Sequence, residues 1–212
     1  MSANISARPI RVLAIDDHPL LREGIASALA DQADMTLVGE AVDARTGIEQ
    51  FRRVRPDVTL MDLQMPDMSG IEAIRIIREE FTDARILVLT TFQGDVQVSG
   101  ALRHGASGFL LKGTLRKELR DAIRAVHAGR RVIPPEVAVG LAEHVGDETL
   151  SLRELEVLRS VAGGNANKSI AAELGISEDT VKAHMKSILA KLDARDRTHA
   201  VVMAVKRGII EI

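Results

Sequence analysis

The strongest constraint on the fold is a regular alternation of short apolar runs and longer amphipathic stretches over the first two-thirds of the chain. Several of the runs are apolar without polar alternation, which is typical of parallel strands buried on both faces. The runs predict five strands: IRVLAI (10–15), MTLVGEA (35–41), DVTLM (57–61), RILVLT (85–90) and GFLL (108–111). Helical periodicity between them predicts helices near 19–31, 43–53, 70–80, 93–103 and 114–128. This order of elements predicts an α/β domain with a doubly wound, five-stranded parallel sheet.

The alternation ends near residue 129, and a different organisation follows. The stretch from 129 to 148 contains Gly129, the Pro134–Pro135 pair, Gly140 and Gly146, which indicates a linker with one short helix near 135–144. Beyond it the periodicity is helical throughout, with helices expected near 151–162, 167–174, 177–191 and 196–207. We therefore predict an α/β domain over 1–128, a linker over 129–148 and a small all-α, four-helix domain over 149–212.

Composition excludes several classes of protein. The 212 residues include no cysteine, which excludes disulfides and thiolate metal sites, and the formal net charge of −2 does not indicate a strongly basic protein. No apolar run approaches the ~18 residues of a membrane span, and the N-terminus lacks the apolar stretch of a signal peptide. We therefore expect a soluble, cytoplasmic protein without a membrane partner.

Polar residues follow the predicted strands at their carboxyl ends. Asp16 and Asp17 follow the first strand and Asp62 the third, whereas Thr90 ends the fourth and Lys112 follows the fifth. Parallel strands present their carboxyl ends at one edge of the sheet, so these side chains should share a crevice. Three neighbouring carboxylates repel unless a cation joins them, and oxygen ligands suit Mg²⁺. An Asp carboxylate can also accept a phosphoryl group covalently, with the lysine and the hydroxyl holding its oxygens.

A simpler interpretation of each residue stays open at this point. A single Asp at the end of a strand is most often a turn former, and Asp17 before HPLLREG is placed to cap the first helix. Thr90, which is followed by Thr91, can be a common strand-forming residue without a functional role. The functional interpretation depends on all five side chains falling at strand ends together.

Residues 10–128 resemble the receiver domain of two-component response regulators, which has a flavodoxin-like fold. Four motifs carry the resemblance: the DD of AIDDHPLLREG, the Asp of LMDLQMPDMSG, the Thr of ILVLTTF and the Lys of GFLLKG. The resemblance implies that Asp62 accepts a phosphoryl group from a sensor histidine kinase. It also implies that Asp17 and Asp62 bind Mg²⁺ directly, that Gln64 adds its backbone carbonyl, and that Asp16 assists, partly through water.

The same resemblance assigns the switch residues. Thr90 and Lys112 would hold the phosphoryl oxygens, and Phe109 would be the switch aromatic. Pro66 and Gly70 match the loop after the acceptor, where both are good turn formers.

Two other classes share parts of this pattern. A phosphotransfer enzyme of the haloacid dehalogenase type needs a second acid two residues after its nucleophile, and that position here is Gln64. A flavin-binding module needs a first loop rich in small residues to cradle a phosphate, whereas DDHPLLREG begins with two acids that repel one. We therefore expect no enzyme beyond self-phosphorylation from a donor and slow dephosphorylation at Asp62.

The helical tail contains the pattern of a helix-turn-helix. In NKSIAAELGISEDTVKAHMKSI a helix is followed by a turn at Gly175 and by a second helix that Ser177 is suited to cap. Ile170, Leu174, Ile176 and Val181 are spaced to pack the two helices together. The outer face of the second helix then carries Lys182, Ala183 and Lys186, with His184 and Lys191 nearby.

Residues 149–212 resemble the LuxR/NarL-type DNA-binding domain, through the pattern L-S-x-R-E-x-E-V-L followed by N-K-x-I-A and T-V-K-x-H. The resemblance implies that Lys182 and Lys186 make the main DNA contacts, with Ala183 facing base edges. The remaining DNA contacts are expected from Thr180, Asn167, Lys168 and His184.

We expect the tail to bind double-stranded promoter DNA as a homodimer. Two or three lysines per domain give weak, salt-sensitive affinity, so specific binding requires two domains on neighbouring half-sites. The last helix carries Val201, Val202, Val205 and Ile209, of which about half should belong to the core. The sequence thus predicts a phosphorylation-dependent transcription regulator.

Overall fold

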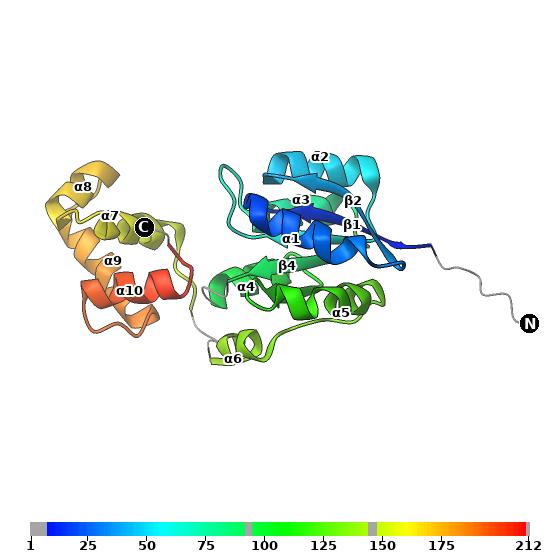
Figure 1. Cartoon of the computed structure of the whole chain (residues 1–212). Helices are drawn as coiled ribbons and strands as arrows, with labels where there is room; N and C mark the ends of the chain where they lie inside the picture. The colour runs from blue at the N-terminus through cyan, green and yellow to red at the C-terminus, as the bar shows by residue number, and fades with distance from the viewer. Residues whose placement is uncertain (1–7, 92–94, 144–147, 211–212) are drawn as a thin grey trace, which may run out of the picture. The chain divides into compact units, whose positions relative to one another are not determined.

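The computed structural model describes residues 8–91, 95–143 and 148–210, which form two compact units (Figure 1). The first unit is built around a sheet and its last segment runs from Val98 to Ala138, whereas the main segment of the second unit starts at Val139. The strands are β1 (Ile10–Ile15), β2 (Met35–Ala41), β3 (Val58–Asp62), β4 (Ile86–Thr90) and β5 (Gly108–Leu111). All neighbouring pairs are parallel and the order is β2-β1-β3-β4-β5, so the predicted flavodoxin-like sheet is confirmed.

Burial explains why the central strands could be recognised. Every residue of β3 and β4 is buried, as expected for strands covered on both faces. Three of the five strands have their predicted bounds. The third begins and ends one residue later than predicted, so that Asp62 is its last residue, and the fourth begins at Ile86.

Helices cover both faces of the sheet. They are α1 (Pro19–Ala30), α2 (Ala44–Val54), α3 (Gly70–Glu80), α4 (Asp95–Arg103) and α5 (Leu115–His127). Residues from α1 and α5, among them Ile25, Leu29, Leu119 and Ile123, share one core cluster with Val12 and other strand residues. On the opposite face α2 packs against β1, because a Cβ on Gly47 would lie 2.7 Å from the side chain of Ile15. The start of the fourth predicted helix, 93–94, lies outside the described residues.

The chain after α5 returns along the edge of the sheet. Gly108 and Val132 form an isolated parallel bridge, and the backbone N–H of Phe109 donates to the carbonyl oxygen of Val132 at 2.7 Å. A Cβ on Gly108 would lie 2.6 Å from that same oxygen, so the approach requires glycine. The short helix α6 (Pro135–Glu143) follows, at the predicted place.

The second unit is helical, as predicted. It contains α7 (Leu152–Ala162), α8 (Asn167–Leu174), α9 (Glu178–Lys191) and α10 (Arg197–Lys206). Gly175 has φ +65° and ends α8, and Ser177 caps α9 by accepting from the backbone N–H of Thr180. Ile170 and Val181 are fully buried in one core cluster, against which Leu174 and Ile176 pack, so the predicted helix-turn-helix packing is confirmed.

Candidate functional site

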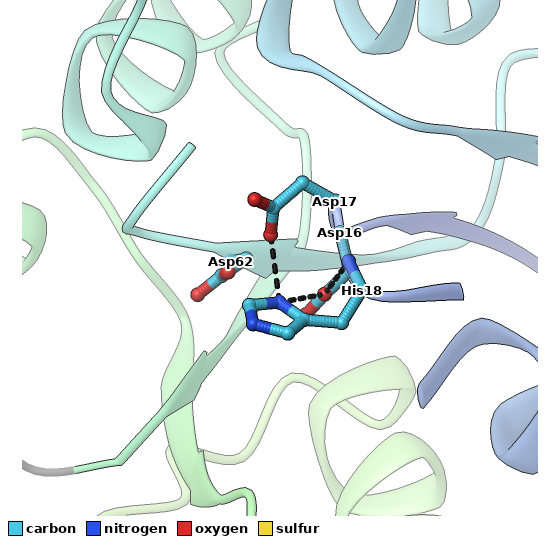
Figure 2. A group of neighbouring side chains, drawn as sticks. All are labelled: Asp16, Asp17, His18 and Asp62. Atoms are coloured by element: carbon cyan, nitrogen blue, oxygen red, sulfur yellow. Dashed lines mark hydrogen bonds and ion pairs between the residues drawn. The ribbon is translucent and has the colours of Figure 1, made fainter. Parts of the chain in front are cut away.

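The three predicted carboxylates meet at the carboxyl ends of β1 and β3. Asp16 is completely buried, Asp62 is 2% exposed, and Asp17 lies at the rim. Side-chain ligand atoms of Asp16, Asp17, His18 and Asp62 all lie within 4.8 Å of one another (Figure 2). The fold therefore concentrates three acids and one imidazole at a single point.

Lys112 joins two of these acids. Its Nζ lies 2.8 Å from Oδ2 of Asp62 and 3.0 Å from Oδ2 of Asp16. Among the described residues neither Oδ2 atom has a hydrogen bond of good alignment, although both atoms are buried. The contacts are thus ion pairs at short range, which leave both oxygens able to take a further partner.

The electrostatics of the pair are set by burial. Burial raises the pKa of Asp62, and the negative charge of the neighbouring Asp16 raises it further. Lys112 lowers this pKa, but not enough to cancel the effect of burial. Burial alone would lower the pKa of Lys112, but its pairing with Asp62 and Asp16 outweighs burial and holds the pKa above its ordinary value. The site thus keeps Lys112 charged, while the buried negative charge of Asp62 is only partly neutralised by its surroundings.

The other predicted residues of the crevice lie on β4, β5 and the loop after β3. Thr90 is nearly buried, and its backbone carbonyl accepts from the backbone N–H of Lys112 at 2.8 Å. Phe109 is completely buried and is paired with Val88 of β4. The backbone N–H of Gln64 lies 3.4 Å from Oδ1 of Asp62, while the predicted role of the Gln64 carbonyl stays a prediction.

The acidic cluster fits a divalent cation. Ligands at about 2.1 Å from one ion lie at most about 4.2 Å apart, so shifts of a few tenths of an ångström would close the 4.8 Å cluster around it. The buried oxygens without aligned hydrogen bonds supply the hard donors that such an ion prefers.

His18 is a member of the cluster that the sequence analysis did not single out. Its Nδ1 lies 2.7 Å from Oδ1 of Asp17 and 3.1 Å from Oδ1 of Asp16. The only sequence signal was its position directly after the two acids. His18, rather than Asp17, is the N-cap residue of α1, so the simpler interpretation of Asp17 as a helix cap is wrong.

In the second unit the outer face of α9 is basic and open. Lys182, Ala183 and Lys186 are exposed, whereas Val181 and Met185 point into the core. Nζ of Lys182 pairs with Oδ1 of Asp179 at 2.9 Å, which raises the pKa of the lysine and lowers that of the aspartate.

The remaining predicted DNA contacts lie on α8 and α9. Asn167 and Lys168 begin α8, where Lys168 is exposed and Asn167 half-buried. The Thr180 hydroxyl lies 2.8 Å from the hydroxyl of Ser177, and His184 is half-buried on α9. Val201 on α10 and Ile209 just beyond its end pack against the core, whereas Val202 and Val205 on α10 are 44% and 36% exposed. The prediction that about half of these four apolar residues belong to the core is thus confirmed.

A buried ionic network holds α9 against α7. Glu154, 4% exposed, accepts from the Ser187 hydroxyl at 2.6 Å, from Nζ of Lys191 at 2.9 Å and from the backbone N–H of Ser151 at 2.7 Å. Burial opposes ionisation, but these partners outweigh it and lower the pKa of Glu154 to about 2. The network fixes the position of α9, on which the exposed lysines stand.

Two families match the chain. Residues 12–124 match the family described as "Response regulator receiver domain", and residues 148–204 match "Bacterial regulatory proteins, luxR family". Among the described residues, none of the helices combines the length and apolar character needed to cross a membrane.

Single proteins resemble the chain along nearly its whole length. It is 43% identical over 214 residues to the transcriptional regulatory protein YxjL of Bacillus subtilis (strain 168), with 95% of this chain and 98% of YxjL covered. It is 38% identical over 207 residues to the response regulator protein VraR of Staphylococcus aureus, with 95% and 99% covered. The structure of RcsB from Salmonella enterica serovar Typhimurium, bound to promoter P1flhDC with the phosphomimetic BeF₃⁻, aligns with a TM-score of 0.72 at 29% identity, covering 94% of this chain and 99% of RcsB.

Proposed function

The chain belongs to the two-component response regulators that carry a LuxR-family DNA-binding domain, and from this we propose that a phosphoryl group on Asp62 switches its binding to promoter DNA. The donor is the phosphohistidine of a sensor histidine kinase. A carboxylate oxygen of Asp62 attacks phosphorus while the bond from phosphorus to the donor nitrogen breaks. The imidazole leaves with the electrons of that bond and takes up a proton.

The position of Lys112 carries this proposal. Its ammonium group stands within 3.0 Å of both buried acids, where it can hold a phosphoryl oxygen once Asp62 is modified. The backbone bond from Lys112 to Thr90 ties the lysine to the strand that presents the threonine hydroxyl. The backbones of Lys112 and Thr90 are therefore joined before the phosphoryl group arrives.

We infer that Asp16, Asp17, Asp62 and the Gln64 carbonyl hold Mg²⁺ for this reaction. When bound, Mg²⁺ supplies positive charge that neutralises the phosphoryl oxygens. Asp16 and Asp17 lie beside the acceptor Asp62, and Lys112 offsets part of the negative charge of Asp16 and Asp62.

The signal would leave the site through β4 and β5. Thr90 turns toward the phosphoryl group, and Phe109, paired to the same strand, changes its packing, which alters the surface around both strands. We propose that this change shifts the population toward a dimer. The exposed Val202 and Val205 on α10 support a dimer contact in the second unit.

We propose that α9 enters the major groove of DNA as a recognition helix. Lys182 and Lys186 then meet the DNA, Ala183 faces base edges, and His184 lies beside them. Phosphate contacts would come from Asn167, Lys168 and Thr180. Two such domains on adjacent half-sites supply the affinity that one domain lacks.

Labelling with acetyl phosphate tests the proposal, with incorporation read by intact mass and DNA binding read by gel shift. The wild type should gain one phosphoryl group and bind promoter DNA more tightly afterwards. Asp62→Asn should gain none, whereas Asp83→Asn, at an exposed position in the same unit, should behave as the wild type. Labelling of Asp62→Asn would identify another acceptor, and equal DNA affinity with and without labelling would contradict the switch.

A further inference from the structure

His18 lies against the acidic cluster, and helix capping does not explain the position of its ring. Its side chain is 66% exposed, and although His18 is the N-cap residue of α1, the ring makes no capping hydrogen bond. The backbone N–H of His18 already donates to Oδ1 of Asp16 at 2.8 Å. Neither helix capping nor the satisfaction of Asp16 therefore requires the imidazole to turn inward.

The ring nonetheless turns toward the acids. Nδ1 lies 2.7 Å from Oδ1 of Asp17 and 3.1 Å from Oδ1 of Asp16, and Figure 2 shows the ring beside both carboxylates. Its ligand atom belongs to the same 4.8 Å group as an oxygen of Asp62. The buried Oδ2 atoms of Asp16 and Asp62 lie near Lys112 but have no aligned hydrogen bond from the described residues.

We infer that His18 supplies a nitrogen ligand to the cation site and makes it prefer first-row transition ions, such as Mn²⁺, Co²⁺ or Zn²⁺, over Mg²⁺. This inference rests on the proposed cation site and deepens it. A site of carboxylates and carbonyls suits Mg²⁺, which takes oxygen ligands and keeps several waters. Imidazole nitrogen suits the later divalent ions, whose affinity for mixed nitrogen and oxygen sites rises along the Irving–Williams order.

The dimensions of the cluster are compatible with one shared ion. Bonds of about 2.0–2.1 Å from zinc to histidine nitrogen and of about 2.0–2.2 Å to carboxylate oxygen place neighbouring ligands about 3 Å apart. The distances from Nδ1 to the two nearest carboxylate oxygens are of this size. Small side-chain shifts would therefore bring the imidazole and the acids onto one ion.

Metal titration of the full chain tests the inference at neutral pH. Mg²⁺ and Co²⁺ are titrated separately by calorimetry into the wild type, His18→Ala and His104→Ala, and the visible absorption of bound Co²⁺ is recorded. His104 is a matched control, because it is an exposed histidine of the first unit outside the cluster. In His18→Ala the Co²⁺ affinity should fall about tenfold or more and the Co²⁺ spectrum should change, while the Mg²⁺ affinity stays within about twofold.

The possible outcomes distinguish failure of the His18 inference from failure of the proposed cation site. Excess Mg²⁺ should displace Co²⁺ from the wild type, since both ions share the site. Unchanged Co²⁺ affinity and spectrum in His18→Ala, with Mg²⁺ still bound by the wild type, would overturn the role of His18 alone. Failure of the wild type to bind either ion would overturn the cation site as well. His18→Asn, which keeps a good capping residue at this position, repeats the test if the alanine variant is unstable.

Discussion

Gly70 lies so close to Asp62 that a Cβ on the glycine would stand 1.9 Å from the Asp62 carbonyl oxygen and 2.8 Å from its carbonyl carbon. The backbone N–H of Gly70 also donates to the carbonyl of Leu63 at 2.9 Å. Gly70 begins α3, so this approach fixes the start of that helix against the end of β3. The residue that the sequence marked only as a turn former therefore positions the backbone of the proposed acceptor.

Gly70→Ala should damage both the fold and the site. The new methyl group would meet backbone atoms, which cannot move aside as a side chain can, and the free energy of unfolding should fall by about 1–3 kcal/mol. Urea unfolding and acetyl phosphate labelling check this. Both the free energy of unfolding and the extent of labelling should decrease. Gly24→Ala is the matched control: its Cβ meets nothing within 4 Å and it lies within α1, so stability should rise slightly. Equal stability of the two variants would contradict the argument.

The sequence predicted the elements well because their signals are local. The apolar runs of β3 and β4 appear as such because both faces of these strands are buried. The helix-turn-helix was recognisable because Gly175 and Ser177 have strong preferences for a C-terminal turn and an N-cap. The meeting of Asp16, Asp62 and Lys112 followed from the rule that parallel strands end at one edge.

Contacts between distant segments could not be predicted in the same way. The contact of the His18 ring with the acids depends on a side-chain rotation that spacing does not specify. Glu154 meets Ser187 and Lys191 only after α7 and α9 pack together. The pairing of Val132 with β5 depends on the path of the chain after α5, which carries no periodic signal.

Thr59→Val should stabilise the protein. Thr59 is the second residue of β3, and its hydroxyl is completely buried and has no hydrogen-bond partner among the described residues. Valine has nearly the same shape and removes the cost of burying the hydroxyl, so the free energy of unfolding should rise by about 1 kcal/mol. Urea unfolding measures the change, and Thr36→Val, at an exposed position of β2, should alter it by less than about 0.5 kcal/mol. A destabilised Thr59→Val would indicate a polar partner for the hydroxyl.

The second unit should lose stability in acid through Glu154. Its pKa is about 2 in the folded chain against an ordinary 4.5, so the folded state favours the carboxylate. Because its pKa is lowered by folding, Glu154 contributes its full stabilisation of the folded state above about pH 4.5. This contribution is lost as the pH falls from 4.5 toward 2. The difference between the two pKa values corresponds to a contribution of up to about 3 kcal/mol to the free energy of unfolding at neutral pH.

Glu154→Gln isolates this contribution. The gap in stability between the wild type and Glu154→Gln should be large at pH 6 and should narrow as the pH falls below about 4.5. Hydrogen exchange of the α7 amides, followed by mass spectrometry, reports on this unit. Glu156→Gln, on the exposed side of the same helix, should show a small gap that hardly changes with pH. A constant gap for Glu154→Gln would mean that its loss acts through packing rather than through charge.

Lys182 and Asp179 should have opposite effects on DNA binding. Lys182 is exposed on α9 and pairs with Asp179 one turn earlier, so DNA must compete with the aspartate for the ammonium group. Lys182→Ala should weaken binding and reduce the slope of log K against log salt concentration by about 1. Asp179→Asn should instead strengthen binding at low salt, because it frees the lysine and removes a negative charge near the phosphates. Fluorescence anisotropy over a salt series measures both effects, with Lys117→Ala on α5 as the control for an exposed lysine outside the second unit. If the slope were the same for Lys182→Ala and the wild type, Lys182 would not contact DNA, and the recognition face of α9 would have to centre on Lys186.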